Sequence, residues 1–155
     1  MRVYFNTNIY CRPFDDLTQK RILNEATASL RLLLLASSRM IKIISSEMVL
    51  TEISLIESVA KKDAVELLVI NNVSEWFKIN PDINKLASGI NAECNIKDYA
   101  DCLHLAFGGL GNCEYFVTCD DELSQEASGI ESFLKKNGFK IKIRNPVQLI
   151  KEMEV

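Results

Sequence analysis

The feature that most constrains the fold of this chain is its alternation of short β-prone runs with longer segments of helical periodicity. Strand patterns occur at residues 3–5, 41–44, 115–118 and 140–143. Helix patterns occur at residues 18–38, 46–59, 62–71, 81–94, 96–110, 129–136 and 147–153. Residues 75–79 fit either a fifth strand or a turn of helix. Such alternation predicts βαβ units, and therefore an α/β fold in which helices cover both faces of a parallel sheet.

The size of the chain favours one domain. Its 155 residues are 48% hydrophobic and 25% charged, which is enough to build a substantial core. No repeat or linker interrupts residues 1–155, so we expect them to form a single domain. The first residues show no secretory pattern, and the longest apolar run, residues 32–36, is too short for a membrane span. We therefore expect a cytoplasmic protein with no membrane partner and with its five cysteines reduced.

The net charge limits how this chain can contact nucleic acid. The formal net charge is −3 at pH 7. Proteins that bind a long phosphate backbone through bulk electrostatics are usually basic. Any contact with nucleic acid must therefore be local, or must be balanced by a metal ion or a partner.

Two predicted strands are followed directly by polar residues. Asn6 follows residues 3–5, and Asp120 follows residues 115–118. In an open parallel sheet, ligands bind beyond the carboxyl ends of the strands, near the point where the strand order reverses. Asn and Asp are also common turn residues, so each of these positions taken alone also fits an ordinary loop.

Glu52 is a carboxylate in an apolar setting. On a helical wheel for residues 46–59 it falls on the apolar side, between Ile56 and Val59. Burying a carboxylate there is costly unless another group pairs with it. The pattern predicts a functional carboxylate, and a nearby Lys or Arg, or a place at the rim of the core, is the alternative.

Asp101 lies in a helix that is apolar almost all round. In the predicted helix 96–110, Asp98, Asp101 and His104 supply the one polar stripe. A helix of this kind is usually buried, so the stripe is predicted to face a crevice, with solvent as the alternative.

These residues would together make an oxygen-rich site. Carboxylate and amide oxygens suit hard divalent cations such as Mg²⁺ or Mn²⁺, which keep several waters and bind phosphates. Such a cation neutralises phosphate charge and lowers the pKa of an attacking water. The sequence therefore predicts a site for metal-assisted hydrolysis.

The order of these motifs resembles that of PIN domains. Residues 3–9 resemble the opening strand and Asp-Thr-Asn motif of that family, and residues 45–53 resemble the block that carries an internal Glu. Residues 98–106 resemble the third block, residues 116–120 the Thr-x-Asp after a strand, and residues 145–146 the usual ending. These matches follow the family's order along nearly the whole chain.

The resemblance implies a three-layer α/β/α fold and a Mg²⁺- or Mn²⁺-dependent endoribonuclease. It also implies an RNA substrate and, as in small VapC-like toxins, an antitoxin protein partner and a homodimer. The implied metal ligands, and thus the catalytic residues, are Asn6, Glu52, Asp101 and Asp120. Asp98 is implied as a supporting carboxylate, and Thr7 and Thr118 as hydroxyls that orient ligands or water.

Asn6 departs from the family pattern, which has Asp at this position. Asn keeps the shape but replaces a carboxylate with one neutral carbonyl oxygen, so we predict weaker metal binding and much reduced cleavage. A natural inactive relative, a substitution introduced by experiment and an active variant that tolerates Asn all fit this departure. A non-catalytic PIN-like module that binds RNA or protein is the alternative function. A receiver-like or phosphotransferase domain that uses Asp120 fits less well, because the other acids fall on helices.

Overall fold

Residues 1–154 are described by a computed structural model in which five parallel strands form one sheet. The strands are β1 (Arg2–Phe5), β2 (Lys42–Ser46), β3 (Val73–Phe77), β4 (Tyr115–Val117) and β5 (Lys142–Arg144). Their order in the sheet is β3-β2-β1-β4-β5. The chain builds outward from β1 in one direction, then returns to add β4 and β5 on the other side. The strand order therefore reverses between β1 and β4.

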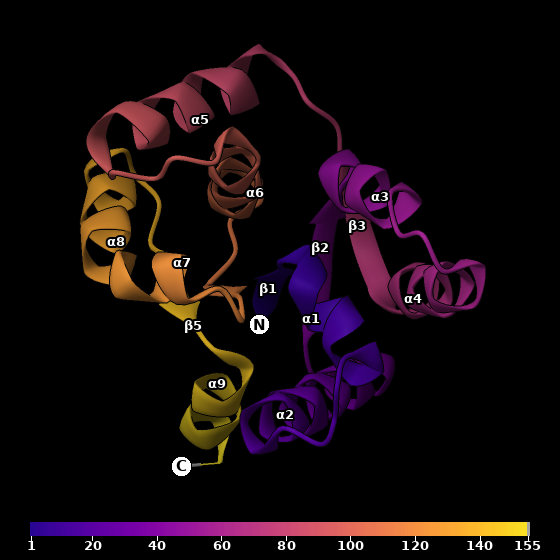
Figure 1. Ribbon diagram of the computed structural model, residues 1–155. Coiled ribbons are helices and arrows are strands. Elements are labelled where there is room, and N and C mark those ends of the chain that lie inside the picture. The colour runs from indigo at the N-terminus through magenta and orange to yellow at the C-terminus, as the bar shows by residue number, and fades with distance from the viewer. Residues whose placement is uncertain (155) are drawn as a thin grey trace.

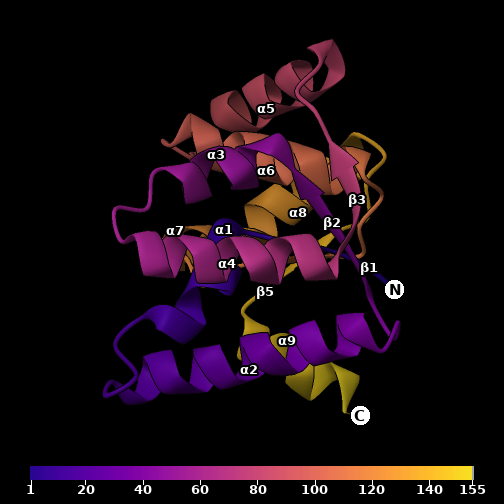
Figure 2. The same ribbon diagram turned by 90° about the vertical axis from the view of Figure 1, so that its right-hand side faces the viewer.

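Helices cover both faces of this sheet (Figures 1 and 2). Along the chain they are α1 (Thr7–Cys11), the 3-10 helix η1 (Arg12–Phe14), α2 (Lys20–Ser37), α3 (Glu47–Ser54), α4 (Val59–Asn72), α5 (Pro81–Glu93), α6 (Tyr99–Leu110), α7 (Asp121–Gln125), α8 (Ala127–Lys136) and α9 (Pro146–Met153). The layer of α5, α6 and α8 lies on one side of the sheet, and the layer of α2, α4 and α9 lies on the other (Figure 1). The predicted three-layer α/β/α fold is confirmed. Among residues 1–154, no helix is both long and apolar enough to cross a membrane.

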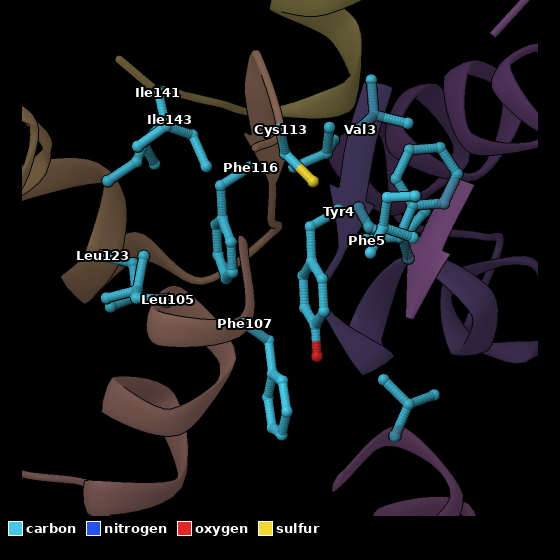
Figure 3. Packing of buried hydrophobic residues seen from close by; sticks show 14 of the residues in the cluster. Val3, Tyr4, Phe5, Leu105, Phe107, Cys113, Phe116, Leu123, Ile141 and Ile143 are labelled. Atoms are coloured by element: carbon cyan, nitrogen blue, oxygen red, sulfur yellow. The ribbon is translucent and has the colours of Figure 1, made fainter. Parts of the chain in front are cut away.

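Helix α6 and strand β1 form the centre of the core. Residues 102–109 of α6 are all buried, as the nearly uniform apolar character of this helix predicts. The ring of Tyr4 lies nearly parallel to the rings of Phe116 and Phe107, with centroid distances of 5.5 Å and 6.5 Å (Figure 3). This stack joins β1, β4 and α6, so it fixes the two strands that flank the reversal point.

Two short helices begin where the sequence pattern predicted loops. Helix α1 begins directly after β1, because Asn6 Oδ1 accepts a hydrogen bond of 2.9 Å from Thr7 N. Helix α7 begins in the same way after Asp120, whose side chain accepts from Glu122 N and Leu123 N. The same residue types favour turns and helix N-caps, so composition alone did not distinguish the two.

The helix that carries Glu52 is shorter than the apolar pattern predicted. Helix α3 ends at Ser54, because Ser58 accepts from Lys61 N and begins the separate helix α4. Ile56 lies outside α3, so the helical-wheel argument for Glu52 was wrong in this respect. The uncertain fifth segment is a strand, with β3 pairing in parallel with β2.

Gly111 at the end of α6 is expected to tolerate no side chain. A Cβ there would meet Phe107 O at 2.8 Å, while Arg2 Nε and Nη2 hold the Gly111 carbonyl at 3.0 and 2.7 Å. We expect Gly111→Ala to lower the free energy of unfolding by about 1–3 kcal/mol in urea denaturation. Gly129→Ala is the control, because a Cβ there meets nothing within 4 Å and should stabilise α8 by up to about 1 kcal/mol. Equal stability of the two variants would contradict this reading of the packing.

Candidate active site

The carboxyl ends of β1 and β4 bring two predicted site residues together. Phe5 pairs with Val117 in the parallel ladder, and Asn6 N donates to Val117 O at 2.9 Å. The next side chains meet, since Asn6 Nδ2 donates to Thr118 Oγ1 at 3.0 Å. This contact lies at the point where the strand order reverses, which is where open α/β sheets bind ligands.

Asn6 is held by hydrogen bonds at both ends of its amide. Asn6 is only 5% exposed. Its Oδ1 accepts a hydrogen bond from Thr7 N, and its Nδ2 donates one to Thr118. Asn8 Nδ2 and Asp120 N also donate to Thr118 Oγ1, at 3.2 and 3.1 Å. Three donors therefore face one hydroxyl oxygen, and the hydroxyl proton has no acceptor within residues 1–154. A carboxylate at position 6 would accept that proton.

Glu52 is held through one of its two carboxylate oxygens. Oε1 accepts from Thr7 Oγ1 at 2.8 Å and also bonds His104 Nε2, whereas Oε2 has no hydrogen-bond partner in the described chain. Burial alone would raise the pKa of Glu52. The hydrogen bond and charge of His104, with the bond from Thr7, outweigh burial and hold that pKa below its usual value. The side chain is 36% exposed, so Glu52 lies at the rim of the core with its free oxygen available.

Asp101 is a carboxylate without a hydrogen-bond partner among residues 1–154. It lies half-buried in the first turn of α6. Burial, followed by the negative charges of Asp98, Asp120 and Glu52, raises the pKa of Asp101 to about 7, although His104 acts in the opposite direction. Three other carboxylates, one on α3, one at the start of α6 and one after β4, therefore lie close enough to Asp101 for their charges to raise its pKa.

Asp98 and Asp120 are both helix N-caps. Asp98 Oδ1 accepts from Ala100 N at 2.9 Å, and Asp120 Oδ1 accepts from Glu122 N at 2.8 Å. The second carboxylate oxygen of each makes no hydrogen bond to the part of the chain that is described. Capping therefore fixes each side chain while leaving one anionic oxygen free.

The donor set fits a hard divalent cation. No three His, Cys, Asp or Glu side chains within residues 1–154 converge closely enough to ligate one ion by themselves. Mg²⁺ needs only one or two carboxylates, because it keeps several waters, and mutual repulsion spreads carboxylates that lack a cation. Glu52, Asp101 and Asp120 each keep an oxygen without a hydrogen-bond partner in residues 1–154, and the charges of Glu52 and Asp120 both act on Asp101. Their role as ligands remains a prediction that this chemistry supports.

Sequence reasoning missed the role of His104. The pattern placed it on the polar stripe of α6 facing a crevice, but the side chain is fully buried. Its Nδ1 lies 2.7 Å from Tyr4 Oη, which in turn lies 2.7 Å from Ser46 Oγ. Ser46 directly precedes α3 as its N-cap residue, but its hydroxyl bonds Tyr4 instead of a helix N–H. The one available indication was a lone His in an apolar helix, three residues after Asp101.

The raised pKa of Asp101 predicts a pH-dependent stability of the metal-free protein. The folded state binds this proton more tightly than the unfolded chain, where the pKa is near 3.8. The stabilising contribution is complete below pH 4 and is lost as pH rises through about 7. In EDTA, we expect Asp101→Asn to be more stable than the parent at pH 8 and to show a smaller decline between pH 5 and pH 8. If urea denaturation gave both proteins the same change in the free energy of unfolding between pH 5 and pH 8, this prediction would be wrong.

Comparison with known proteins shows the fold. No protein-family model matches this chain, and no curated protein matches it. Among solved structures, it is similar to the crystal structure of FitAcB from Neisseria gonorrhoeae, with a TM-score of 0.56 and 14% identity over 93% of this chain and 97% of that chain. At this identity the similarity carries the fold alone. The chain therefore has the three-layer α/β/α architecture expected of a PIN-like domain.

Proposed function

We propose that this protein is a PIN-type endoribonuclease that depends on Mg²⁺ or Mn²⁺ and whose activity is impaired by Asn6. The observation that carries the proposal is Asp101, a half-buried carboxylate with no hydrogen-bond partner in residues 1–154 and a pKa raised to about 7. An unpaired carboxylate beside other carboxylates is unfavourable unless a cation or proton joins it. Such perturbed groups at the ligand-binding edge of a sheet are typical of functional sites.

The roles of the residues follow from their free oxygens. Glu52 Oε2, Asp101 and the free oxygen of Asp120 would hold the cation, with Asn6 completing the set. A bound cation would supply charge neutralisation for the phosphate and a lower pKa for an attacking water. Thr7 fixes Glu52, and Thr118 fixes Asn6. Asp98 adds negative charge that favours occupancy by a cation.

The PIN resemblance also supports an RNA substrate and a protein partner. Small PIN domains of this size include toxins that an antitoxin holds, and a homodimer is compatible with this. On the described surface, Leu55, Val59 and Leu67 of the α3–α4 region are large, exposed and apolar, which supports contact with another protein.

A non-catalytic PIN-like module that binds RNA or protein is the second candidate. It is favoured by the arrangement of Asn6, because both polar atoms of its amide already bond to the protein itself. A site with three carboxylates and no oxygen from position 6 would bind a cation weakly.

Calorimetric titration with Mn²⁺ tests the proposal directly. We expect binding by the parent protein, at least tenfold weaker binding by Asp101→Asn, and no change in Asp82→Asn, which alters an exposed carboxylate at the start of α5. Each variant is then incubated with a mixed RNA pool in Mn²⁺. Absence of Mn²⁺ binding by both the parent and Asn6→Asp, or equal binding by the parent, Asp101→Asn and Asp82→Asn, would rule out this metal site.

A further inference from the structure

We infer that His104 is a positioning residue that aims one oxygen of Glu52 into the metal site, with Tyr4 and Ser46 fixing the imidazole ring from the interior. This inference rests on the proposed function, because it concerns the same site. It adds residues that lie behind the carboxylates and do not contact substrate.

A continuous hydrogen-bonded row links the core to the site. Ser46 Oγ lies 2.7 Å from Tyr4 Oη, Tyr4 Oη lies 2.7 Å from His104 Nδ1, and His104 Nε2 bonds Glu52 Oε1. Tyr4, Ser46 and His104 are all fully buried. In Figure 3 the Tyr4 hydroxyl points away from its strand, at the far end of a ring packed beside Phe116 and Phe107. The row is therefore anchored in the buried core.

The direction of the protons is consistent along the row. Burial raises the pKa of Tyr4, so its hydroxyl remains a donor. An ionised Glu52 can only accept, so His104 Nε2 carries the hydrogen of this contact, and Tyr4 donates its hydroxyl proton to Nδ1. Ser46 then donates to Tyr4. Every polar atom in this buried row has a partner, which fixes the ring orientation.

The two carboxylate oxygens of Glu52 therefore have different surroundings. His104 on α6 and Thr7 on α1 both form a hydrogen bond with Oε1. Oε2 is left without a partner in residues 1–154 and is the oxygen that would face a cation. Glu52 lies two residues before the end of the short helix α3, so these two bonds provide its fixed orientation. Groups that orient a ligating side chain in this way raise metal affinity.

A purely structural role explains this row less well. A leucine or phenylalanine could fill the position of His104 in the core without the desolvation that a buried His–Glu pair requires. The ring instead ends at a carboxylate on the rim of the site. Its polar atoms are therefore best explained by the need to hold that carboxylate.

The test is Mn²⁺ affinity measured by calorimetry on four single variants. We expect His104→Leu to weaken Mn²⁺ binding about 10- to 100-fold, and His104→Gln, which keeps an N–H near Nε2, to restore it to within a few-fold of the parent. Tyr4→Phe should give an intermediate loss. Tyr10→Phe is the matched control, because Tyr10 is also fully buried and lies near Ser45, yet neither hydroxyl meets hydrogen-bond geometry within residues 1–154.

Because the chain has a single histidine, its ring nitrogens can be observed without ambiguity by nitrogen-15 NMR. We expect a proton on Nε2 that exchanges slowly with water. If the parent binds Mn²⁺ and His104→Leu binds it equally well, the positioning role is wrong while the metal site stands. If neither the parent nor Asn6→Asp binds Mn²⁺, the proposed function fails and the positioning role fails with it. Should His104→Leu not fold, unequal affinities of Tyr4→Phe and Tyr10→Phe support the role, and equal affinities overturn it.

Discussion

Replacing Asn6 by aspartate is expected to raise Mn²⁺-dependent cleavage of RNA by a factor of about 10²–10³. The change adds a carboxylate at the reversal point of the sheet, where Asn6 now contributes a neutral amide. The surroundings are suited to it, because Thr7 N already donates to one side-chain oxygen. The Thr118 hydroxyl, which now receives three donors, would turn its own proton toward the new oxygen. We therefore expect the variant to fold without rearrangement.

The measurement compares initial cleavage rates of a mixed RNA pool by the parent and by Asn6→Asp at equal Mn²⁺ concentration. Asn112→Asp is the control for added charge, because Asn112 is exposed and precedes β4, at the opposite edge of the sheet. Cleavage should rise only in Asn6→Asp. If this variant binds Mn²⁺ and still does not cleave, the binding-module alternative becomes the better account of the protein.

Replacing Glu25 by alanine is expected to lower the free energy of unfolding by about 3–5 kcal/mol. Glu25 is 2% exposed, and its Oε1 accepts from Arg12 at 3.2 Å and from Arg21 at 3.1 Å. Its Oε2 accepts from Asn145 at 2.9 Å, which ties α2 to the cap of α9. Removing the carboxylate leaves the Arg12 guanidinium, only 19% exposed, with Asp15 as its remaining partner. The change therefore removes one acceptor from the partly buried Arg12 guanidinium and another from Asn145, and breaking a buried network of this kind is among the more destabilising single changes.

Urea denaturation at pH 7 measures this effect, and a thermal scan should show a melting temperature lower by about 10 °C. Arg21→Ala is the control, because the Arg21 side chain is 57% exposed and its ion pairs should be worth less than about 1 kcal/mol. A loss below 1 kcal/mol in Glu25→Ala would mean that the desolvation of this cluster nearly cancels its attraction.

The sequence alone determined the layered fold, because strand and helix periodicities are local properties of the chain. The buried run in β1 and the nearly apolar α6 were both evident from residue spacing. The sequence also indicated that Asn6 and Asp120 both follow strands of one parallel sheet, whereas the contact of Asn6 with Thr118 came from the structure. Boundaries were less certain at Asn6 and Ser58, because turn-forming residues also begin helices.

Only the tertiary structure decided the partners of the buried polar groups. His104 bonds a carboxylate 52 residues away, and Asn145 bonds one 120 residues away. The structure also decided which oxygen of Glu52 is free, because Thr7 and His104 both bond Oε1 and leave Oε2 without a partner in residues 1–154. The physical reason is that a hydrogen bond requires atoms placed to within a few tenths of an ångström. That placement depends on how α1, α3 and α6 pack against the sheet, and residue spacing along the chain does not encode it locally.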